Sequence, residues 1–416
     1  MKNKTIWWIS PHKLLLFFLL PIYLIVYFVD FEGRIYFDTA YFWMGIIFLI
    51  LFILGSSLGS NVHIVKNNNE FIVKPIYLDI LAILTLVAYF IWFYKFLINP
   101  NWIIAILNGE MGPGTIRSLV GTIPGLTTLT QLGVVYALFY INQYKYMKLN
   151  VRRRYNVYLI LIFGMTLFRV LVWSERLAFI ELLIAVFVLL ISKKDTKKYK
   201  SIVNTLPYLG IIALFIFFGV TEYFRSWKTH YQYIYDDYFQ FVATRILDYY
   251  YTALNNGAGF LYNSNWPTYN FEYTLNWLYQ FPIIGEFLFE SIVKTQSYKL
   301  FLENYANPEF NNPSGIFVYF YDLGIPLTMV FILLVSFIIG ILYREFIQNK
   351  GLGSIIYPAI YIGILEILRI PYLTSSRLFP IILFITLGFI VFRVKKFDGV
   401  EYKKQKKHRK RYKIRW

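Results

Sequence analysis

Titratable side chains gather in one long polar stretch of this sequence, between two groups of apolar segments. The stretch runs from Arg225 to Pro313 and is rich in tyrosine, tryptophan and asparagine. Arginine and lysine bind anionic groups, and a histidine or carboxylate beside them can take the proton of a hydroxyl. We therefore predict acid–base chemistry on an anionic substrate, carried by residues at the start of the stretch: Arg225, Lys228, His230, Asp236, Asp237, Arg245 and Asp248.

Three residues are candidates for the general base. His230 is the only one of the four histidines in this stretch, and an imidazole titrates close to neutral pH. Glu222 closes the apolar segment that precedes the stretch, and Asp237 is one of two adjacent aspartates. Simpler roles stay open, because a loop histidine can be merely solvated and an aspartate can cap a helix.

Seven arginines at or near the ends of apolar segments are candidates for binding a pyrophosphate. A guanidinium is planar, always charged, and binds phosphate oxygens in pairs. Charged residues at such positions are costly unless paired or solvated, so each is a functional candidate. Two of the seven follow a glutamate by three residues, which also suits a simple ion pair, and any arginine can extend to lipid headgroups. The seven are Arg117, Arg169, Arg176, Arg225, Arg245, Arg369 and Arg377.

Sequence patterns for metal or nucleotide binding are missing. There is no HExxH pattern, no clustered histidines and no spaced acidic pair of the kind that binds a sugar nucleotide through a metal. There is also no P-loop. We therefore expect neither a metal nor another cofactor. The chain has no cysteine, which excludes disulfides and thiolate chemistry.

The elements that position these residues are predicted to be membrane helices. The composition is 58% apolar, mean hydropathy is +0.51, and apolar runs of about 20 residues recur, the length that crosses a bilayer core of ~30 Å. We predict an all-α polytopic membrane protein, a single domain over 1–416. The ten expected spans are 14–29, 39–59, 77–97, 125–144, 157–172, 177–192, 206–223, 324–343, 354–368 and 378–394.

Positive charge predicts how the chain is oriented. With the N-terminus inside, 29 of the 41 lysines and arginines fall in inner segments, including a basic tail over 395–416. Inner loops of membrane proteins are enriched in these residues, so both termini are predicted to be cytoplasmic and the loop over 224–313, between spans seven and eight, to be outside. The net charge of +18 is then explained by topology and by contact with anionic membrane lipids, and we expect no nucleic-acid partner.

Two helices are predicted inside the large outer loop. Residues 236–255 have an acidic start and a glycine, Gly257, just beyond the end, and 286–305 form a second amphipathic segment. The aromatic side chains of the loop suit the membrane interface, and their faces can also stack on sugar rings.

This layout resembles the oligosaccharide repeat-unit (Wzy-like) polymerases of bacterial polysaccharide synthesis, the O-antigen, capsule and exopolysaccharide polymerases. Local matches are Arg117 ahead of Gly125-Leu126-Thr127-Thr128-Leu129, and Ser174-Glu175-Arg176-Leu177-Ala178 running into Glu181. Two more are Glu222-Tyr223-Phe224-Arg225-Ser226, which closes a span, and Ser314-Gly315 with Tyr321-Asp322-x-Gly324, which follow the loop.

The resemblance implies glycan transfer at the outer face of the bacterial cytoplasmic membrane. A growing chain leaves its undecaprenyl pyrophosphate carrier and joins the incoming undecaprenyl-pyrophosphate-linked oligosaccharide. The arginines would neutralise the leaving diphosphate, and His230, Glu222 or Asp237 would deprotonate the acceptor hydroxyl. A chain-length regulator and a flippase are implied as partners.

Three other functions share parts of the pattern. A polysaccharide ligase uses the same carrier lipid but hands finished polymer to a different acceptor. A flippase or exporter of lipid-linked sugars would also bind pyrophosphate, although it would carry more charges in the middle of its spans. A non-catalytic scaffold of a synthesis complex fits everything except the surplus of outer arginines.

Overall fold

The computed structural model describes residues 6–29, 35–63, 72–193, 200–228, 230–282, 284–285, 287–289, 297–306 and 310–394. Within these ranges the regular structure is helical, apart from one isolated β-bridge between Val73 and Arg393. The prediction of an all-α fold is confirmed. The basic segment 395–416, predicted as a cytoplasmic tail, lies outside the described residues.

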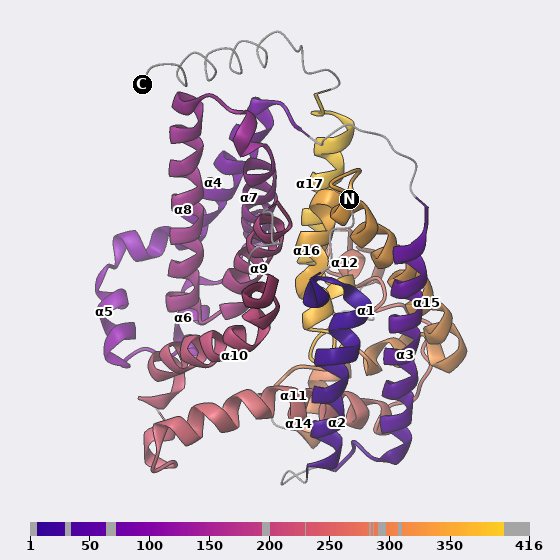
Figure 1. The fold of residues 1–416 in the computed structure, drawn as a ribbon. Coiled ribbons are helices and arrows are strands. Elements are labelled where there is room, and N and C mark those ends of the chain that lie inside the picture. The colour runs from indigo at the N-terminus through magenta and orange to yellow at the C-terminus, as the bar shows by residue number, and fades with distance from the viewer. Residues whose placement is uncertain are drawn as a thin grey trace.

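Among the described residues, six helices are long and apolar enough to cross a membrane; Figure 1 shows how they are arranged. The shortest has 18 residues, and because a helix rises ~1.5 Å per residue, the other five exceed the ~30 Å of a bilayer core. The first combines α1 (Pro11–Leu14), the π-helical turn η2 (Leu15–Leu19) and α2 (Leu20–Phe28). The others are α3 (Thr39–Asn61), α4 (Pro75–Ile98), α8 (Leu149–Trp173), most of α10 (Lys200–Glu222) and α15 (Phe317–Gln348).

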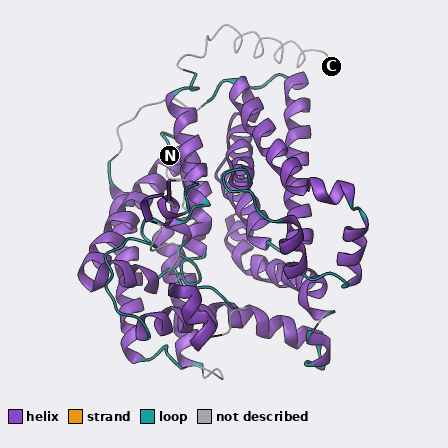
Figure 2. Ribbon diagram, turned by 180° about the vertical axis from the view of Figure 1, so that it is seen from behind, coloured by secondary structure: helices purple, strands orange, loops and turns teal. Residues whose placement is uncertain are grey.

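The other four predicted spans fall on shorter or more charged helices: α7 (Leu132–Gln143), α9 (Arg176–Lys193), α16 (Gly353–Leu365) and α17 (Leu378–Ile390). α9 carries Arg176, Glu181 and Lys193, and the other three have 12 or 13 residues. A 13-residue helix is roughly 20 Å long. Figures 1 and 2 show these helices among the long ones. Crossings beyond the six therefore stay a prediction.

Small residues let α3 and α15 pack at close range. A Cβ built on Gly59 would lie 2.0 Å from the carbonyl oxygen of Phe337, and one built on Gly340 would lie 2.3 Å from that of Ser56. Backbones this close leave no room for a larger residue at either glycine. α15 also changes direction at Gly324, whose φ of 70° lies in the left-handed region.

Between α4 and α7 the chain forms three short helices beside the bundle. They are α5 (Asn101–Asn108), α6 (Pro113–Val120) and the 3-10 helix η3 (Thr127–Gln131). The turn predicted after Asn108 is present, since Gly109 ends α5 with a φ of 80°. α6 packs against α8, and η3 packs against α4.

The polar stretch folds at one end of the molecule, which we call the α11 end. α11 (Tyr238–Tyr262) lies across that end, below the long helices in Figure 1. It confirms a helix in the region predicted over 236–255, but the predicted end is wrong, because the helix continues through Gly257 to Tyr262. α14 (Ser297–Tyr305) matches the end of the second predicted helix, whose earlier residues lie largely outside the described ranges. The short pieces are η5 (Tyr223–Trp227), η6 (Tyr231–Tyr233) and α12 (Asn276–Tyr279).

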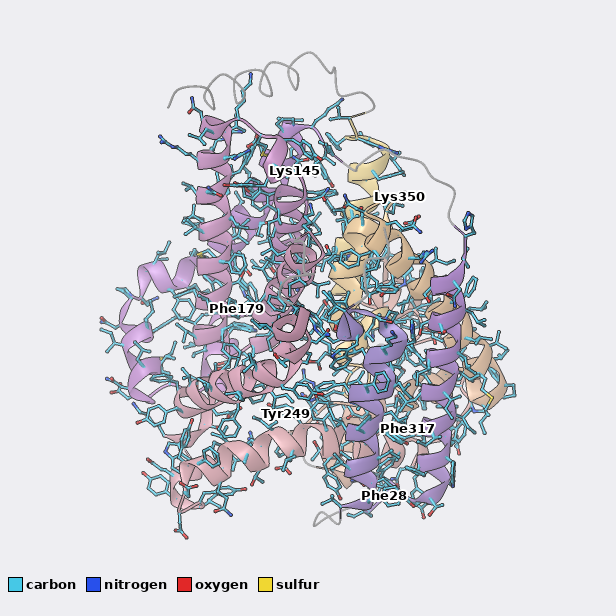
Figure 3. The ribbon with its side chains drawn as sticks, in the orientation of Figure 1. Phe28, Lys145, Phe179, Tyr249, Phe317 and Lys350 are labelled. Atoms are coloured by element: carbon cyan, nitrogen blue, oxygen red, sulfur yellow. The ribbon has the colours of Figure 1, made fainter. Side chains whose placement is uncertain are left out.

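The two ends of the molecule differ in the residues they carry. Figure 3 shows Tyr249 and Phe28 at the α11 end, with Lys145 and Lys350 toward the opposite end. The turns at that opposite end include the basic stretch 145–154. The basic stretch 145–154 and Lys350 therefore lie toward the end of the bundle opposite the α11 end.

Candidate functional site

Arg377, at the start of α17, binds two carboxylates. Its Nε donates to Oε1 of Glu181 at 2.7 Å and its Nη2 donates to Oε2 at 2.8 Å, a bidentate pair. Its Nη1 donates to Glu175, and Glu175 also accepts from Nη2 of Arg169 at 2.6 Å. Glu175 therefore bridges Arg169 and Arg377 and ties together the ends of α8, α9 and α17.

The turn between α8 and α9 explains the position of Glu175. Ser174 adopts a φ of 56°, and this left-handed conformation lets the chain reverse within two residues. Burial alone would raise the pKa of Glu175, but the guanidinium groups of Arg377 and Arg169 outweigh burial and hold the pKa below its usual value. The carboxylate is therefore charged at neutral pH.

η3 and α4 complete the surroundings of this ion network. Nη1 of Arg169 donates to Thr130 Oγ1 at 3.0 Å, and its guanidinium lies 4.7 Å from the ring centre of Trp92. The side-chain amide of Gln131, oriented to suit both partners, donates to Glu181 at 3.0 Å and accepts from Arg377 at 2.9 Å. Uncharged donors and acceptors thus surround the charged groups.

A second buried ion pair joins α9 to the end of α10. Nη2 of Arg176 lies 2.9 Å from Oε1 of Glu222, whose side chain has no exposed surface. Ser226 donates to Oε2 of Glu222 at 2.5 Å, and the Arg176 guanidinium lies 3.9 Å from the ring centre of Phe218. Removing one partner of such a pair typically costs about 3–5 kcal/mol, because a buried charge is left uncompensated.

Tyr249 of α11 contacts two of the arginines. Its hydroxyl accepts from Nη2 of Arg176 at 2.7 Å. The guanidinium of Arg369 lies 5.3 Å from its ring centre, within the range of a cation–π interaction. Arg369 is also paired with Glu366, with 2.6 Å between Nε and Oε2. Tyr249 therefore connects α9 and α11 to the segment that follows α16.

Arg245 lies one turn before Tyr249 on α11 and is buried against aromatic rings. Its guanidinium is 4.6 Å from the ring centre of Phe310 and 4.9 Å from that of Tyr231, and its Nη1 donates to the Tyr231 hydroxyl at 3.3 Å. Phe310 packs edge-on against Tyr249, with ring centres 6.1 Å apart. Arg245 therefore adjoins the group around Tyr249.

Five of the seven predicted arginines thus lie in two groups at the α11 end. The groups meet in the sequence at Glu175 and Arg176, and together we call them the arginine cluster. Four glutamates lie among them, Glu175, Glu181, Glu222 and Glu366. A guanidinium has five N–H donors, and a carboxylate uses at most two or three of them. The cluster therefore combines donors for phosphate oxygens with carboxylates that can accept a proton. Its arginines are Arg169, Arg176, Arg245, Arg369 and Arg377.

The other two predicted arginines are not part of this network as described. Arg117 of α6 is exposed and donates to the carbonyl oxygen of Trp173 at 3.3 Å, beside the end of α8. No carboxylate among the described residues pairs with it. The backbone of Arg225 lies in η5, and its side chain lies outside what the structure describes.

The three candidate bases occupy different surroundings. Glu222 lies inside the arginine cluster. His230 is exposed, with its ring edge-on to Tyr231 at 4.9 Å between ring centres. Asp237 is the N-cap of α11, and its carboxylate accepts from the backbone N–H of Gln240 at 2.8 Å. That contact gives Asp237 the capping role that the sequence had left open.

Several members of the network were not predicted as site residues. Glu175 and Glu181 appear in a matched motif without an assigned role, although a carboxylate inside an apolar segment is itself a signal of function. Gln131 and Tyr249 give no such signal, because the chain has 37 tyrosines and spacing does not single out one of them. Their proximity to the arginines arises only from the way the helices pack.

A pocket opens beside Arg176, between α8, α9, η5 and the short helices α5 and α6. Its cavity volume is about 20 Å³, room for roughly one water molecule. Its walls are mostly apolar, with Ser174, Arg176 and Thr221 as the polar groups. Phe224 of η5 forms part of the wall. The pocket therefore lies against Arg176 on the side of the bundle that carries α5 and α6.

The carboxylate of Asp322 fixes the segment 267–274 to α15. Asp322 is fully buried, and its Oδ2 accepts from the backbone N–H groups of Tyr273 and Thr274 at 2.7 Å each, and from Thr274 Oγ1 at 2.9 Å. Burial and the nearby negative charge of Asp322 raise the pKa of Glu272 to about 7. At Gly324 a Cβ would lie 3.1 Å from Pro267. In this chain, the Tyr321-Asp322-x-Gly324 motif therefore holds the segment 267–274 in place.

Comparison of the chain with protein-family models, with curated protein sequences and with solved structures finds no match. Within the described residues, no three His, Asp or Glu side chains gather as a metal-ligand group. Conclusions about function therefore rest on the chemistry of the arginine cluster and on the sequence.

Proposed function

We propose that this protein is a membrane glycosyltransferase that polymerises undecaprenyl-pyrophosphate-linked oligosaccharide repeat units. The reaction takes place at the outer face of the bacterial cytoplasmic membrane, the chain crosses that membrane ten times, and both termini are cytoplasmic. The growing glycan is the donor, and a hydroxyl of the incoming repeat unit is the acceptor.

The observation that carries the proposal is the convergence of five arginines at the α11 end, opposite the basic loops. Arginines outside the membrane oppose the usual distribution of positive charge, so a function is needed to account for them. A leaving pyrophosphate provides one, since its negative charge grows as the glycosidic bond breaks and preorganised guanidinium groups stabilise that charge. The arrangement around Tyr249 brings three of these arginines, Arg176, Arg245 and Arg369, to one place.

The step itself is a substitution at the anomeric carbon of the donor sugar. The bond from this carbon to the pyrophosphate oxygen breaks, and a bond to the acceptor hydroxyl oxygen forms. The hydroxyl proton passes to a base, and the electron pair of the broken bond stays on the pyrophosphate. We assign the base first to Glu222, because its carboxylate lies beside Arg176, and keep His230 and Asp237 as the other candidates.

The arginines have different parts in this scheme. Arg176, Arg369 and Arg245 adjoin the same tyrosine and would contact the pyrophosphate. Arg169 and Arg377 are tied to Glu175 and Glu181 and would hold the ends of α8, α9 and α17 in position. Arg117 and Arg225 are proposed to bind the second lipid-linked pyrophosphate, that of the acceptor.

The first test is the length profile of lipid-linked and surface glycan in a strain without this gene. The proposal predicts single repeat units and loss of the ladder, restored by the wild-type gene. Re-expression with Arg176, Arg225 or Arg377 replaced by alanine should leave the protein in the membrane without long polymer. Lys299→Ala is the matched control, since Lys299 is exposed on α14 at the same end and lies 3.9 Å from Glu303.

Three outcomes would reject the polymerase. Full-length polymer held on the carrier lipid in the deletion strain would identify a ligase instead. An unchanged ladder in that strain, or normal polymer length in all three arginine variants, would remove glycan polymerisation from the account.

A further inference from the structure

An apolar groove lies between the outer end of α10 and the first turns of α11, and nothing described so far uses it. Its cavity volume is about 380 Å³. Every side chain along it is apolar or aromatic, including Ile216, Val220 and Phe224 on one wall and Phe239 and Val242 on the other. From Phe215 to Phe224 the wall is roughly 13 Å long at ~1.5 Å per residue, which suits a length of hydrocarbon chain.

The groove is open to the surroundings of the bundle. Ile216 is 60% exposed, Val220 55% and Phe239 67%. α10 is a candidate membrane span, so the groove lies where such a span ends, next to α11 (Figure 1). Exposed apolar side chains on facing helices at this depth contact hydrocarbon chains in a membrane, rather than water.

A cation stands at the rim of the groove. The Nζ of Lys228 lies 5.1 Å from the ring centre of Tyr223 and 5.6 Å from that of Phe224, two residues that line the groove. Its hydrogen bond goes to the carbonyl oxygen of Leu107 at 3.3 Å, and no carboxylate within the described residues pairs with it. Lys228 therefore keeps its positive charge available to an anion.

The groove adjoins the pocket beside Arg176. Phe224 lines both of them. A molecule with a hydrocarbon chain in the groove would thus carry its polar end past Lys228 and toward the arginine cluster.

We infer that this groove binds the polyprenyl chain of a single-chain lipid phosphate, with Lys228 contacting the phosphate. The occupant is a single chain because one groove is present, whereas a phospholipid would bring two acyl chains. This inference rests on the proposed function, since it places the lipid carrier of that reaction, and it assigns Lys228 as a binding residue outside the arginine cluster.

Photolabelling of the full-length protein in phosphatidylcholine nanodiscs tests this inference. The probe is undecaprenyl phosphate with a diazirine in its chain. We expect the probe to label α10 and α11. Unlabelled undecaprenyl phosphate should reduce this labelling, and undecaprenol, which lacks the phosphate, should reduce it more weakly. Phosphatidylglycerol should not reduce it. Displacement by phosphatidylglycerol as strong as by undecaprenyl phosphate would show an ordinary membrane lipid in the groove and overturn the inference.

Matched variants on one helix define the groove as the site. Gly219→Leu fills it, and a Cβ at Gly219 meets nothing closer than 3.9 Å, so the fold accepts the change. Labelling should fall about tenfold because buried methylene contacts are lost. Gly210→Leu is the control, since a Cβ there meets nothing within 4 Å and Gly210 is not part of the groove. Val220→Trp, at an exposed position, should act like Gly219→Leu.

The charge at the rim is tested separately. Lys228→Gln should weaken labelling by undecaprenyl phosphate about fivefold, the effect of one lysine beside an anionic headgroup, and leave competition by undecaprenol unchanged. Wild-type labelling in Gly219→Leu and Val220→Trp would refute the groove, and wild-type labelling in Lys228→Gln would refute the role of Lys228.

The glycan profile of the same strains separates this inference from the proposed function. If labelling follows these expectations but the deletion strain keeps its ladder, the groove binds a polyprenyl lipid in a protein with another function. If the deletion strain loses its ladder but Gly219→Leu is labelled like the wild type, the polymerase stands and the groove is rejected.

Discussion

Arg176 donates a hydrogen bond from Nη2 to the hydroxyl of Tyr249 at 2.7 Å, from α9 to α11. The two residues are 73 positions apart in the chain. Through this contact, α11, which lies across the end of the bundle, binds Arg176, the ion-pair partner of Glu222. A catalytic role of the arginine cluster should therefore depend on Tyr249 as a positioning residue.

Tyr249→Phe should lower polymerisation by about tenfold while preserving the fold. The change removes the hydrogen bond to Arg176, and a hydrogen bond to a charged group contributes roughly 1.5–3 kcal/mol. The ring that faces Arg369 is kept. Tyr249→Leu removes both contacts and should be more severe. Polymer length per cell, corrected for protein in the membrane, measures the effect, and equal polymer in wild type and both variants would contradict a positioning role.

Glu175→Gln should destabilise the protein, because Arg169 loses its carboxylate and Arg377 keeps only Glu181. The expected cost is about 3 kcal/mol, the lower range for breaking a buried ion pair. Adding Arg169→Gln removes the uncompensated charge and should recover part of that stability. Thermal unfolding in detergent measures both variants. A double variant no more stable than Glu175→Gln would show that the bridge is not what Glu175 contributes.

Glu222→Gln should abolish polymerisation if Glu222 is the base, because an amide cannot accept the acceptor proton. Asp237→Ala should instead cost about 1 kcal/mol of stability through loss of the helix cap, and Asp237→Ser should restore it. Normal polymer in Glu222→Gln together with loss of polymer in His230→Gln would move the role of the base to His230.

Glu272 should make the stability of the protein depend on pH. Its pKa is about 7 in the folded protein, against 4.5 for an unperturbed glutamate, so the folded state holds a proton between these values that the unfolded state has released. The free energy of unfolding should therefore fall as pH rises from about 4.5 to about 7 and be level above that range. Glu272→Gln should remove this component, visible as the difference in thermal midpoint between wild type and variant from pH 5 to 8. An identical pH dependence in both would contradict the assignment.

The sequence predicts the helices of this fold better than the contacts of its site. Apolar runs and caps predict α3, α4, α8 and α11, since these depend on local composition. The arginines were predicted as anion-binding residues because charge at a helix end is costly. Their partners depend on packing between segments far apart in the chain, as with Arg377 and Glu181, 196 positions apart. No spacing rule could have identified Tyr249 or Gln131.

Asp237 and Asp322 are two further residues whose roles depend on contacts that the sequence does not reveal. Asp237 was weighed in advance as either a base or a helix cap, and the hydrogen bond to Gln240 shows the cap. Asp322 belongs to a motif matched by resemblance. In the structure, its contacts with Tyr273 and Thr274 hold the segment 267–274 against α15. Residue type alone does not distinguish a carboxylate that accepts hydrogen bonds from backbone N–H groups from one that accepts a proton in a reaction.

The most direct test of the central claim is polymerisation by the purified protein in liposomes with undecaprenyl-pyrophosphate-linked repeat units as the only substrate. The account predicts a ladder of glycans that grows with time, with one undecaprenyl pyrophosphate released per linkage. Arg176→Lys should be defective, because one ammonium cannot replace the donors shared between Glu222 and Tyr249, and Lys299→Ala should be normal. Folded wild-type protein that leaves every repeat unit as a monomer would contradict the account.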